Sequence, residues 1–356
     1  MLTTVSDFSQ FIQQAKAVGH SLCIRGSGSK DFYGNPSQGQ ELSTLSYRGI
    51  IDYEPTELVI TARAGTPMRE IESALKEKNQ MLGFEAPYFS DQATLGGVIA
   101  AGLSGPRRPY AGAVRDLLLG IRMIDGHGSD LNFGGRVIKN VAGFDLSRLM
   151  AGSMGTLGLV LEASLKTVPL PAFELSLRQI CSLKEAIERT NHWAGQALPL
   201  SASAWVANQL HIRLSGAESA VHSAALKLGG ETIPFIQAQQ LWTSLRDHTH
   251  SFFNDPRPLW RLSLRSTAGE LNIEGEQLIE WGGAQRWVKT HQSASHLRQL
   301  ASAHGGHATL FKGKAPPDGV FHPLSPALEK IHRQLKKTFD PAFLFNPGRL
   351  YPDSNL

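Results

Sequence analysis

The chain has 356 residues, of which 41% are hydrophobic and 19% charged, and its formal net charge is +4. This length predicts two or three domains, each able to bury a core. The charge is mild and its lysines and arginines are scattered, which argues against nucleic acid as a partner; a small anionic substrate, an anionic cofactor or an acidic protein surface would each fit. No segment approaches the roughly 20 unbroken apolar residues of a membrane-spanning helix, and residues 1–14 lack a leader pattern. We therefore expect a cytoplasmic protein that does not span a membrane.

The two cysteines, Cys23 and Cys181, fall in segments that resemble strands. Two thiols cannot build a disulfide framework or a four-thiolate metal site. We expect both to be buried and reduced.

The chain begins with the pattern of a helix, a strand and a glycine-rich loop. Apolar residues recur at helical spacing through 5–18, and the apolar run 21–25 leads into glycines. Two further apolar runs, 50–53 and 58–64, are separated by turn residues and predict a hairpin.

Another helix is predicted directly after this hairpin. Thr66 can cap it and Pro67 suits its first turn. Residues 92–112 then form a stretch poor in charge and rich in Gly and Ala, which favours close packing of the backbone against a flat group.

A second hairpin is predicted from runs 117–124 and 129–133, which turn on an Asp-Gly-His-Gly sequence. Residues 157–168 predict one more strand. Pro169 and Pro171 then interrupt the pattern, and we place the first domain boundary there.

Helical and strand-like segments alternate after this boundary. Helices are predicted at 183–194, 217–228, 236–253 and 293–303, and strands at 174–180, 202–214, 259–265 and 277–289. The last helix, 325–339, carries an apolar stripe of Leu328, Ile331, Leu335 and Phe339. The segment that follows this helix begins with apolar residues, and we expect it to fold back onto the first domain.

The first candidate site is a loop of small residues after the predicted strand at 21–25, comprising Arg25, Gly26, Ser27, Gly28 and Ser29. Successive small residues let several backbone N–H groups converge on one anion, as a pyrophosphate requires. A plain glycine-rich turn would explain the same residues. The nicotinamide fingerprint does not fit, because Asp31 stands where its third glycine belongs.

The second candidate site comprises Thr94, Leu95, Gly96, Gly97, Ala101 and Gly102, and continues to Ser104 and Gly105. Paired glycines behind a threonine let backbone amides and one hydroxyl approach a ligand where any Cβ would intrude. A tightly packed helix is the alternative explanation.

The third candidate site is the glycine loop 152–158, which enters a strand. Its main-chain groups suit the edge of a planar ring. The candidate contacts here are Gly155, Thr156, Gly158 and Val160.

Three such loops in this order resemble the FAD-binding domain of the vanillyl-alcohol oxidase or p-cresol methylhydroxylase type, over about residues 5–170 and the later Asn-Pro-Gly at 346–348. The resemblance implies that the first loop wraps the pyrophosphate, the second lines the ribityl and flavin portion, and the third holds adenine and ring edges. It implies an α+β fold, with an FAD-binding domain of two α/β subdomains and an α+β cap domain with an antiparallel sheet. The corresponding domains are 1–172, a cap facing substrate or a partner at 173–318, and a C-terminal segment at 319–356 that returns to the FAD domain.

A closer resemblance rests on the strings at 137–145, 105–108 and 345–352. These are similar to the family of FAD-binding subunits of glycolate oxidase across nearly the full length. The resemblance implies a second FAD-containing subunit and an iron–sulfur subunit, which together oxidise glycolate to glyoxylate. Such an assembly would lie in the cytoplasm, either free or at the inner face of the membrane. Arg349, near the returning tail, is a further candidate cofactor contact.

Two departures from related proteins are informative. Some members of the fold attach flavin through a histidine after the first loop, but Ser29 and Lys30 stand there, so we expect non-covalent FAD. Relatives that oxidise D-2-hydroxy acids share a His-Gly-Asp-Gly-Asn string that binds a metal and substrate. The nearest stretch here, 304–308, has His304 and His307 but no carboxylate, and we expect no metal site.

The candidate catalytic residues are Lys139 and Arg115, and Lys139 and Asn140 are also candidate flavin contacts. A reduced flavin gathers negative charge near N1 and C2=O, so a fixed cation there would favour hydride acceptance. A surface ion pair of Arg115 with Asp116 or Asp145 is the alternative.

Three functions remain open at this point. The first is an FAD-binding subunit of a glycolate or similar 2-hydroxy-acid dehydrogenase assembly. The second is a self-sufficient FAD-dependent dehydrogenase or oxidase of a small hydroxy acid. The third is a non-catalytic subunit whose flavin is structural or relays electrons, which the missing His-Gly-Asp-Gly-Asn string favours.

Overall fold

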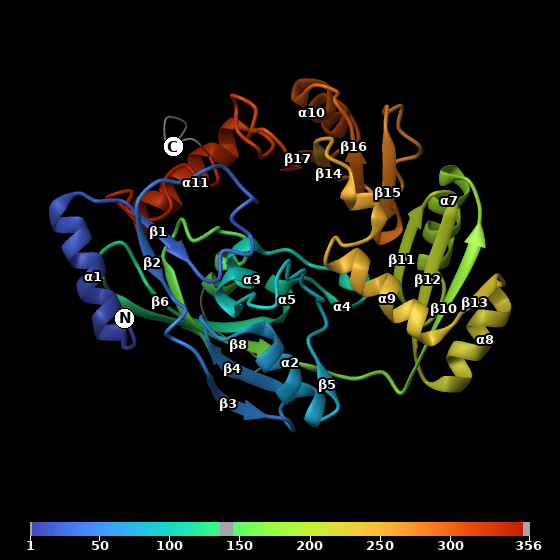
Figure 1. Cartoon of the computed structure of the whole chain (residues 1–356), viewed down its shortest axis with the longest axis horizontal. Coiled ribbons are helices and arrows are strands. Elements are labelled where there is room, and N and C mark those ends of the chain that lie inside the picture. Colours follow the sequence, from blue (N-terminus) through green and yellow to red (C-terminus); the bar gives the residue numbers. More distant parts are fainter. Residues whose placement is uncertain (1, 136–144, 352–356) are drawn as a thin grey trace. The chain divides into compact units, whose positions relative to one another are not determined.

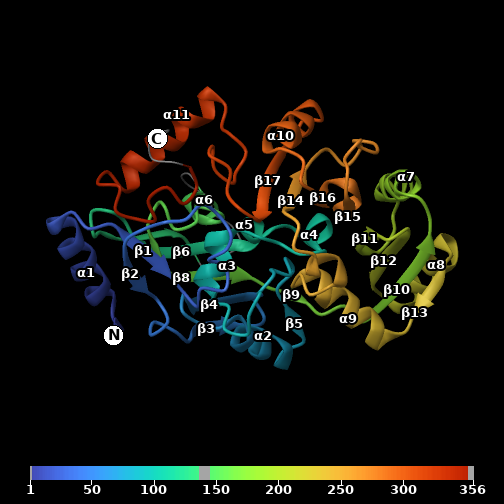
Figure 2. The same ribbon diagram turned by 45° about the horizontal axis from the view of Figure 1, so that its top comes forward.

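The computed structural model describes residues 2–135 and 145–351. Contacts divide the chain into unit 1, comprising Met1–Leu103, Gly112–Leu170 and Pro323–Leu356, and unit 2, comprising Ser104–Ala111 and Pro171–His322. Both units combine helices with antiparallel sheets, which confirms the predicted α+β class (Figures 1 and 2). The domain limits placed at residues 172 and 318 stay predictions.

The first layer of unit 1 is helix α1 (Val5–Val18) beside the parallel strands β1 (Leu22–Arg25) and β2 (Gln40–Ser43), as both views show. Thr4 caps α1 through a reciprocal pair of hydrogen bonds with Asp7, and the helix ends at Gly19 in the left-handed conformation. The buried side chains that join these elements include Phe8, Ile12, Leu22, Leu42 and Phe345.

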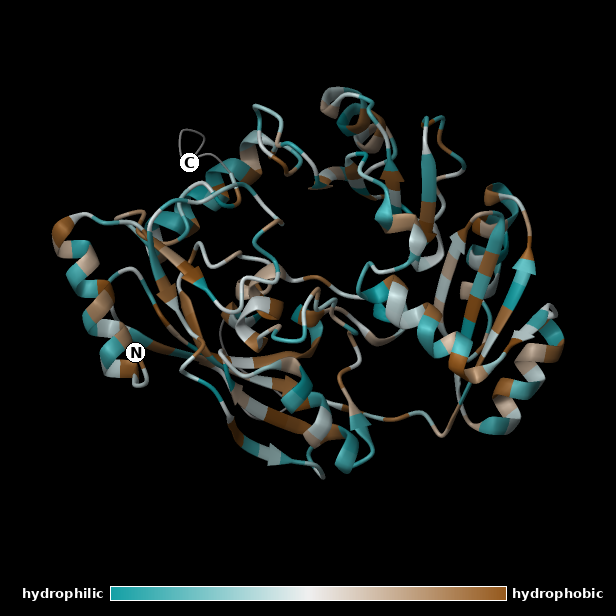
Figure 3. Ribbon diagram, in the orientation of Figure 1, coloured by the Kyte–Doolittle hydropathy of each residue, from teal (hydrophilic) through white to brown (hydrophobic). Residues whose placement is uncertain are grey.

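The second layer of unit 1 is a five-stranded antiparallel sheet in the order β3-β4-β8-β6-β7. Its strands are β3 (Ile50–Glu54), β4 (Val59–Arg63), β6 (Leu118–Ile124), β7 (Asp130–Gly134) and β8 (Leu159–Lys166). Both predicted hairpins and the predicted strand after residue 157 are confirmed. Hydrophobic residues dominate the central strands of this sheet (Figure 3), where Ile60, Met123, Ala163 and Leu165 are buried.

Short helices complete unit 1. They are α2 (Met68–Glu77), α3 (Leu95–Ala101), α5 (Val114–Leu117), α6 (Leu146–Met150) and α11 (Pro326–Phe339), with a small strand pair β5 (Gln80–Met81) and β9 (Val168–Pro169). The predicted cap of α2 is wrong: Pro67 occupies the cap position, and the Thr66 hydroxyl instead bonds the backbone of Gly49.

Helix α11 differs from its predicted apolar stripe. Leu328 and Ile331, in its first half, are 49% and 53% exposed, whereas Phe339 is buried and Leu335 packs against the core of unit 1. The helix therefore packs on the sheet only through its second half.

The core of unit 2 is an eight-stranded antiparallel sheet in the order β13-β10-β12-β11-β15-β16-β14-β17. Its strands are β10 (Phe173–Ile180), β11 (Leu200–Val206), β12 (Gln209–Gly216), β13 (Glu231–Ile233), β14 (Leu259–Ser263), β15 (Glu276–Glu280), β16 (Gln285–Lys289) and β17 (His307–Lys312). Its helices are α4 (Arg108–Ala111), α7 (Leu183–Ala194), α8 (Glu218–Leu228), α9 (Phe235–Arg246) and α10 (Ala294–Ala303), with 3-10 turns η1 (Ser251–Asn254) and η2 (Trp281–Gly283).

Two predicted strands of unit 2 are hairpins. The run 202–214 turns at Ala207 and Asn208, whose φ angles are 50° and 60°, and the run 277–289 turns through η2. The predicted helix 236–253 ends at Arg246, and η1 follows after a break.

The chain after α11 returns to β1, as predicted. Leu22 donates its N–H to the Leu344 carbonyl, and Phe345, which is fully buried, forms a bridge with Leu22. This pairing places residues 344–346 beside β1 in unit 1.

Candidate functional site

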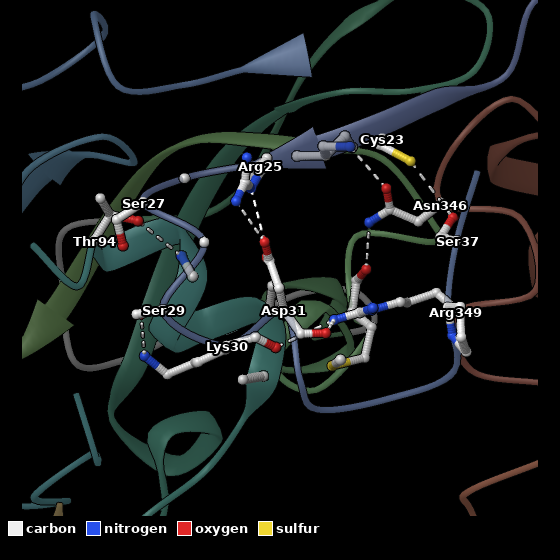
Figure 4. A pocket seen from close by; sticks show the side chains of 18 residues that line it. Cys23, Arg25, Ser27, Ser29, Lys30, Asp31, Ser37, Thr94, Asn346 and Arg349 are labelled. Atoms are coloured by element: carbon white, nitrogen blue, oxygen red, sulfur yellow. Dashed lines mark hydrogen bonds and ion pairs between the residues drawn. The ribbon is translucent and has the colours of Figure 1, made fainter. Parts of the chain in front are cut away.

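A cavity of about 370 Å³ in unit 1 joins the first candidate loop to α3 and to the C-terminal tail (Figure 4). The predicted cofactor contacts that line it are Arg25, Gly26, Ser27, Gly28, Ser29, Thr94, Gly97, Ala101 and Arg349. Segments from both ends of the sequence therefore meet at one site.

The loop after β1 is shaped by Arg25. Its guanidinium pairs with Asp31 at 2.7 Å and with Glu41 at 3.0 Å, and its side chain is 46% exposed. Hydrogen bonds with Glu41 and Asp31 raise the pKa of Arg25. The two carboxylates hold this partly exposed cation in place beside the loop.

Two glycines let this loop pack closely against neighbouring groups. Gly28 has φ +75°, which favours glycine, and a Cβ on Gly26 would lie 2.3 Å from the Thr94 hydroxyl oxygen. Any larger residue at position 26 would therefore push the loop away from α3. This wall of the cavity is lined by the run of small residues from Gly26 to Ser29. The backbone groups of such a run suit a diphosphate, so these residues fit the pyrophosphate of FAD.

Helix α3 uses its small residues in two ways. Thr94 caps the helix by accepting from the Gly97 N–H, and Gly97 and Ala101 face the cavity. Leu95 is fully buried in the core, and a Cβ on Gly96 would lie 2.9 Å from the Ala64 Cβ. For these last two residues, the tightly packed helix considered from the sequence describes the structure.

The end of α3 and the third loop are governed by packing against other segments. Gly102, with φ +61°, would bring a Cβ to 2.8 Å from the Gly152 backbone, and one on Gly155 would lie 2.6 Å from the Asn346 amide nitrogen. A Cβ on Gly158 would meet the Met123 side chain at 2.3 Å. None of these three glycines lines the cavity.

Thr156 and Val160, the two other candidate contacts of this segment, also lie away from the cavity. Thr156 is buried and its hydroxyl donates to the Ser153 carbonyl, while Val160 belongs to β8 and packs against the core. Thr156 instead lines a smaller neighbouring cavity of about 130 Å³. Contacts of this loop with FAD stay predictions.

Ser104 and Gly105 belong to unit 2. The Gly105 carbonyl accepts a hydrogen bond from the Trp281 indole at 3.0 Å, and the neighbouring Arg107 pairs with Glu174 at 2.8 Å. Their prediction as flavin contacts is not tested by these interactions.

Of the candidate catalytic residues, Lys139 lies outside the described residues, as does the candidate flavin contact Asn140. Arg115 is exposed on α5. The two carboxylates considered as its partners have other interactions: Asp116 accepts from the Ala113 N–H, and Asp145 pairs with Arg148.

Sequence reasoning missed several residues of the cavity. They are Cys23, Ile24, Lys30, Asp31, Pro36, Ser37, Ala100, Met154 and Asn346. Lys30 is 8% exposed, and its ammonium group lies 3.4 Å from the Tyr88 carbonyl and 5.7 Å from the centre of the Phe89 ring. Its place directly after the glycine-serine loop was the available signal, and the signal for Met154 was its place within the third candidate loop, 152–158.

Within residues 2–135 and 145–351, no group of three or more His, Cys, Asp and Glu side chains is arranged to hold a metal. His304 ends α10, Gly305 follows with φ +69°, and His307 starts β17. The two histidines are therefore not on one helix face. Across the same described ranges, no helix combines the length and apolar character needed to cross a membrane.

Comparison with known proteins places this site in a family. Residues 1–134 match the FAD binding domain family. Over 351 residues the chain is 48% identical to the glycolate oxidase subunit GlcE of Escherichia coli (strain K12), covering 98% of each chain. The chain belongs to the GlcE family of glycolate oxidase subunits. This confirms the family and the FAD cofactor predicted from the sequence.

More distant similarities agree with this family. The glycolate oxidase subunit GlcD of Bacillus subtilis (strain 168) is 30% identical over 168 residues, which cover 47% of this chain and 36% of GlcD. A solved structure of alkyldihydroxyacetonephosphate synthase matches with a TM-score of 0.66 at 14% identity, over 97% of this chain and 76% of that chain. The latter likeness concerns the fold alone.

Proposed function

We propose that this chain is the FAD-binding subunit of a multi-subunit enzyme that oxidises glycolate to glyoxylate. FAD is held non-covalently in the unit 1 cavity, and electrons leave through the flavin to an iron–sulfur subunit. The observation that carries this proposal is a cavity lined by a glycine- and serine-rich loop, in a chain that matches a glycolate oxidase subunit over 98% of its length.

The cavity offers two kinds of group to the diphosphate of FAD. Backbone groups from Gly26 to Ser29 receive the diphosphate, with the Thr94 hydroxyl beside them. The cations of Lys30 and Arg349 line the same cavity and offset the diphosphate charge. FAD supplies the redox chemistry when bound, and the chain's own residues bind and orient it.

The proposed partners are a second FAD-containing subunit that oxidises the 2-hydroxy acid and an iron–sulfur subunit. Support for a partner comes from the similarity of this chain to two different glycolate oxidase subunits, GlcE and GlcD. The assembled enzyme works in the cytoplasm or at the inner face of the membrane.

Flavin uptake by the purified chain tests the proposal. We expect the chain to acquire a flavin absorption spectrum with FAD and to release all flavin into the supernatant on acid precipitation, because no covalent bond holds it. A chain that stays colourless after incubation with FAD would overturn the proposal.

The second candidate function is that of a non-catalytic subunit whose flavin relays electrons. It is favoured by the His304 to His307 stretch, which forms a helix-to-strand turn instead of a ligand-bearing helix face. Glycolate added to the isolated, FAD-loaded chain separates a self-sufficient enzyme from a subunit that depends on its partner. Bleaching of the flavin would favour a self-sufficient enzyme; bleaching only after the GlcD-like subunit is added would favour catalysis or relay within the assembly.

A further inference from the structure

The C-terminal tail, residues 344–350, contacts three separate segments that form the cavity of unit 1. These are β1, the loop 28–37 that follows it, and the turn around Met154. The tail thus completes a cavity whose recognisable motif lies at the other end of the chain.

Asn346 joins two walls of the cavity (Figure 4). Its side-chain oxygen accepts from the Ile24 N–H at 2.7 Å, and its amide nitrogen donates to the Met154 carbonyl at 2.6 Å. The side chain is 93% buried and the residue has φ +41°, a conformation that asparagine tolerates better than most residues. Because both ends of the amide are used, β1 and the Met154 turn keep a fixed separation.

Arg349 is the centre around which the loop 28–35 is wrapped. Its guanidinium donates to the carbonyls of Lys30, Asp31 and Asn35 at 3.2, 3.1 and 3.0 Å. Gly34, with φ +97°, passes so close that a Cβ there would lie 3.2 Å from the guanidinium Nε. Holding these carbonyls on a cation keeps them from facing an anionic ligand.

The loop holds the tail in return. The Asn35 side chain donates to the carbonyls of Gly348 and Leu350, and the Ser37 hydroxyl donates to the Pro347 carbonyl at 3.0 Å. The Asn35 N–H also donates to the Arg349 carbonyl. This reciprocal set of bonds means that loop and tail adopt their conformations together.

We propose that the tail is the second half of the cofactor site, in which Arg349 and Asn346 are positioning residues that hold the phosphate loop in its ligand-binding shape. This inference rests on the proposed binding of FAD to the cavity. Without the tail, the glycine-rich sequence alone leaves the loop in many conformations, and ligand binding must then order it.

Arg349→Met, which removes the guanidinium but keeps a long side chain, tests the proposal. FAD affinity, measured by flavin fluorescence titration, should fall roughly 10-fold to 100-fold, because charge-assisted hydrogen bonds are lost and the loop must be ordered on binding. In the apo chain, backbone amides of residues 26–37 should exchange with solvent deuterium faster than in the wild type. The matched control is Lys337→Met, which removes an exposed cation from the same end of the chain and should change neither quantity.

Two further variants, Arg349→Lys and Asn35→Ala, test the positioning role of the tail independently of Arg349→Met. Arg349→Lys keeps the charge without the planar fork, so loop exchange should stay fast and affinity should recover only in part. Asn35→Ala removes the bonds to Gly348 and Leu350 from the loop side, and it should shift exchange and affinity in the same direction even if Arg349→Met fails to fold.

The outcomes are distinct. Wild-type affinity and wild-type exchange in Arg349→Lys would overturn the positioning role and leave Arg349 as a charge alone. Unchanged exchange in both Arg349→Met and Asn35→Ala would also overturn it. Failure of the wild-type chain to bind FAD would instead overturn the proposed function, and so the two failures are separable.

Discussion

The carboxylate of Asp340 lies 2.7 Å from the ammonium group of Lys336, and both side chains are buried. Lys336 also donates to the carbonyls of Thr156 and Phe345, and Asp340 accepts from the backbone N–H groups of Leu344 and Phe345. All strong donors and acceptors of the pair are thus used. The pair joins the end of α11 to the start of the tail.

Replacing Lys336 by Met should destabilise the protein strongly, because it leaves the Asp340 charge buried without its partner. We expect a loss of about 3–5 kcal/mol in the free energy of unfolding, measured by urea denaturation with circular dichroism. The neighbouring Lys337→Met, at an exposed position, should change it by less than about 0.5 kcal/mol. Equal effects of the two substitutions would contradict a buried pair.

Gly26→Ala should weaken FAD binding through a clash with the Thr94 hydroxyl, which a Cβ would approach to 2.3 Å. The loss should be at least about tenfold, because the loop must shift away from α3. Adding Thr94→Ala removes the clashing oxygen, so the double variant should bind FAD better than Gly26→Ala alone. If the two effects simply add in a double-mutant cycle, the contact does not limit this loop.

The Arg107–Glu174 pair should matter more than a similar pair on the surface of unit 2. Its side chains are 9% and 27% exposed, against 40% and 64% for Arg178 and Glu231. Arg107→Met should cost on the order of 3 kcal/mol, since Glu174 loses its main partner in a desolvated setting. Arg178→Met should cost about 0–1 kcal/mol. All six tryptophans lie in unit 2, so their fluorescence during denaturation reports this unit.

Acid should destabilise unit 2 through His211. Burial, with smaller contributions from His250 and Arg178, lowers the pKa of His211 from 6.5 to about 4. Between these pH values the unfolded chain binds a proton at this histidine that the folded chain does not. The free energy of unfolding is therefore highest above pH 6.5 and decreases as the pH falls towards 4. Tryptophan-monitored denaturation should show His211→Gln losing less stability over this window, by up to about 1.4 kcal/mol per pH unit. Parallel pH profiles would refute this assignment.

Much of the fold could be predicted because its elements carry local signals. The predicted helix at 183–194 matches α7, and both hairpins of unit 1 were recognised by apolar runs around turn residues. The hairpin at Ala207 and Asn208 was missed because only one of its turn residues favours a positive φ. The exposure of Leu328 and Ile331 was missed because a periodic stripe does not reveal how far the opposing surface extends.

The candidate site was predictable to the extent that glycine marks it. Glycine sequence alone does not distinguish a ligand cavity from close packing: Gly26 lines the cavity beside Thr94, whereas Gly96 packs against Ala64 and Gly158 against Met123. Asn346 reaches the cavity only through tertiary pairing of the two ends of the chain.

The bridge between Leu22 and Phe345 also sets an order of events during protein synthesis. Residues 344–346, which pair with β1, follow every residue of unit 2 in the chain, so β1 is synthesised before unit 2 and long before its partner. The layer of α1, β1 and β2 therefore gains this contact only after the tail has left the ribosome, although β1 is made well before it.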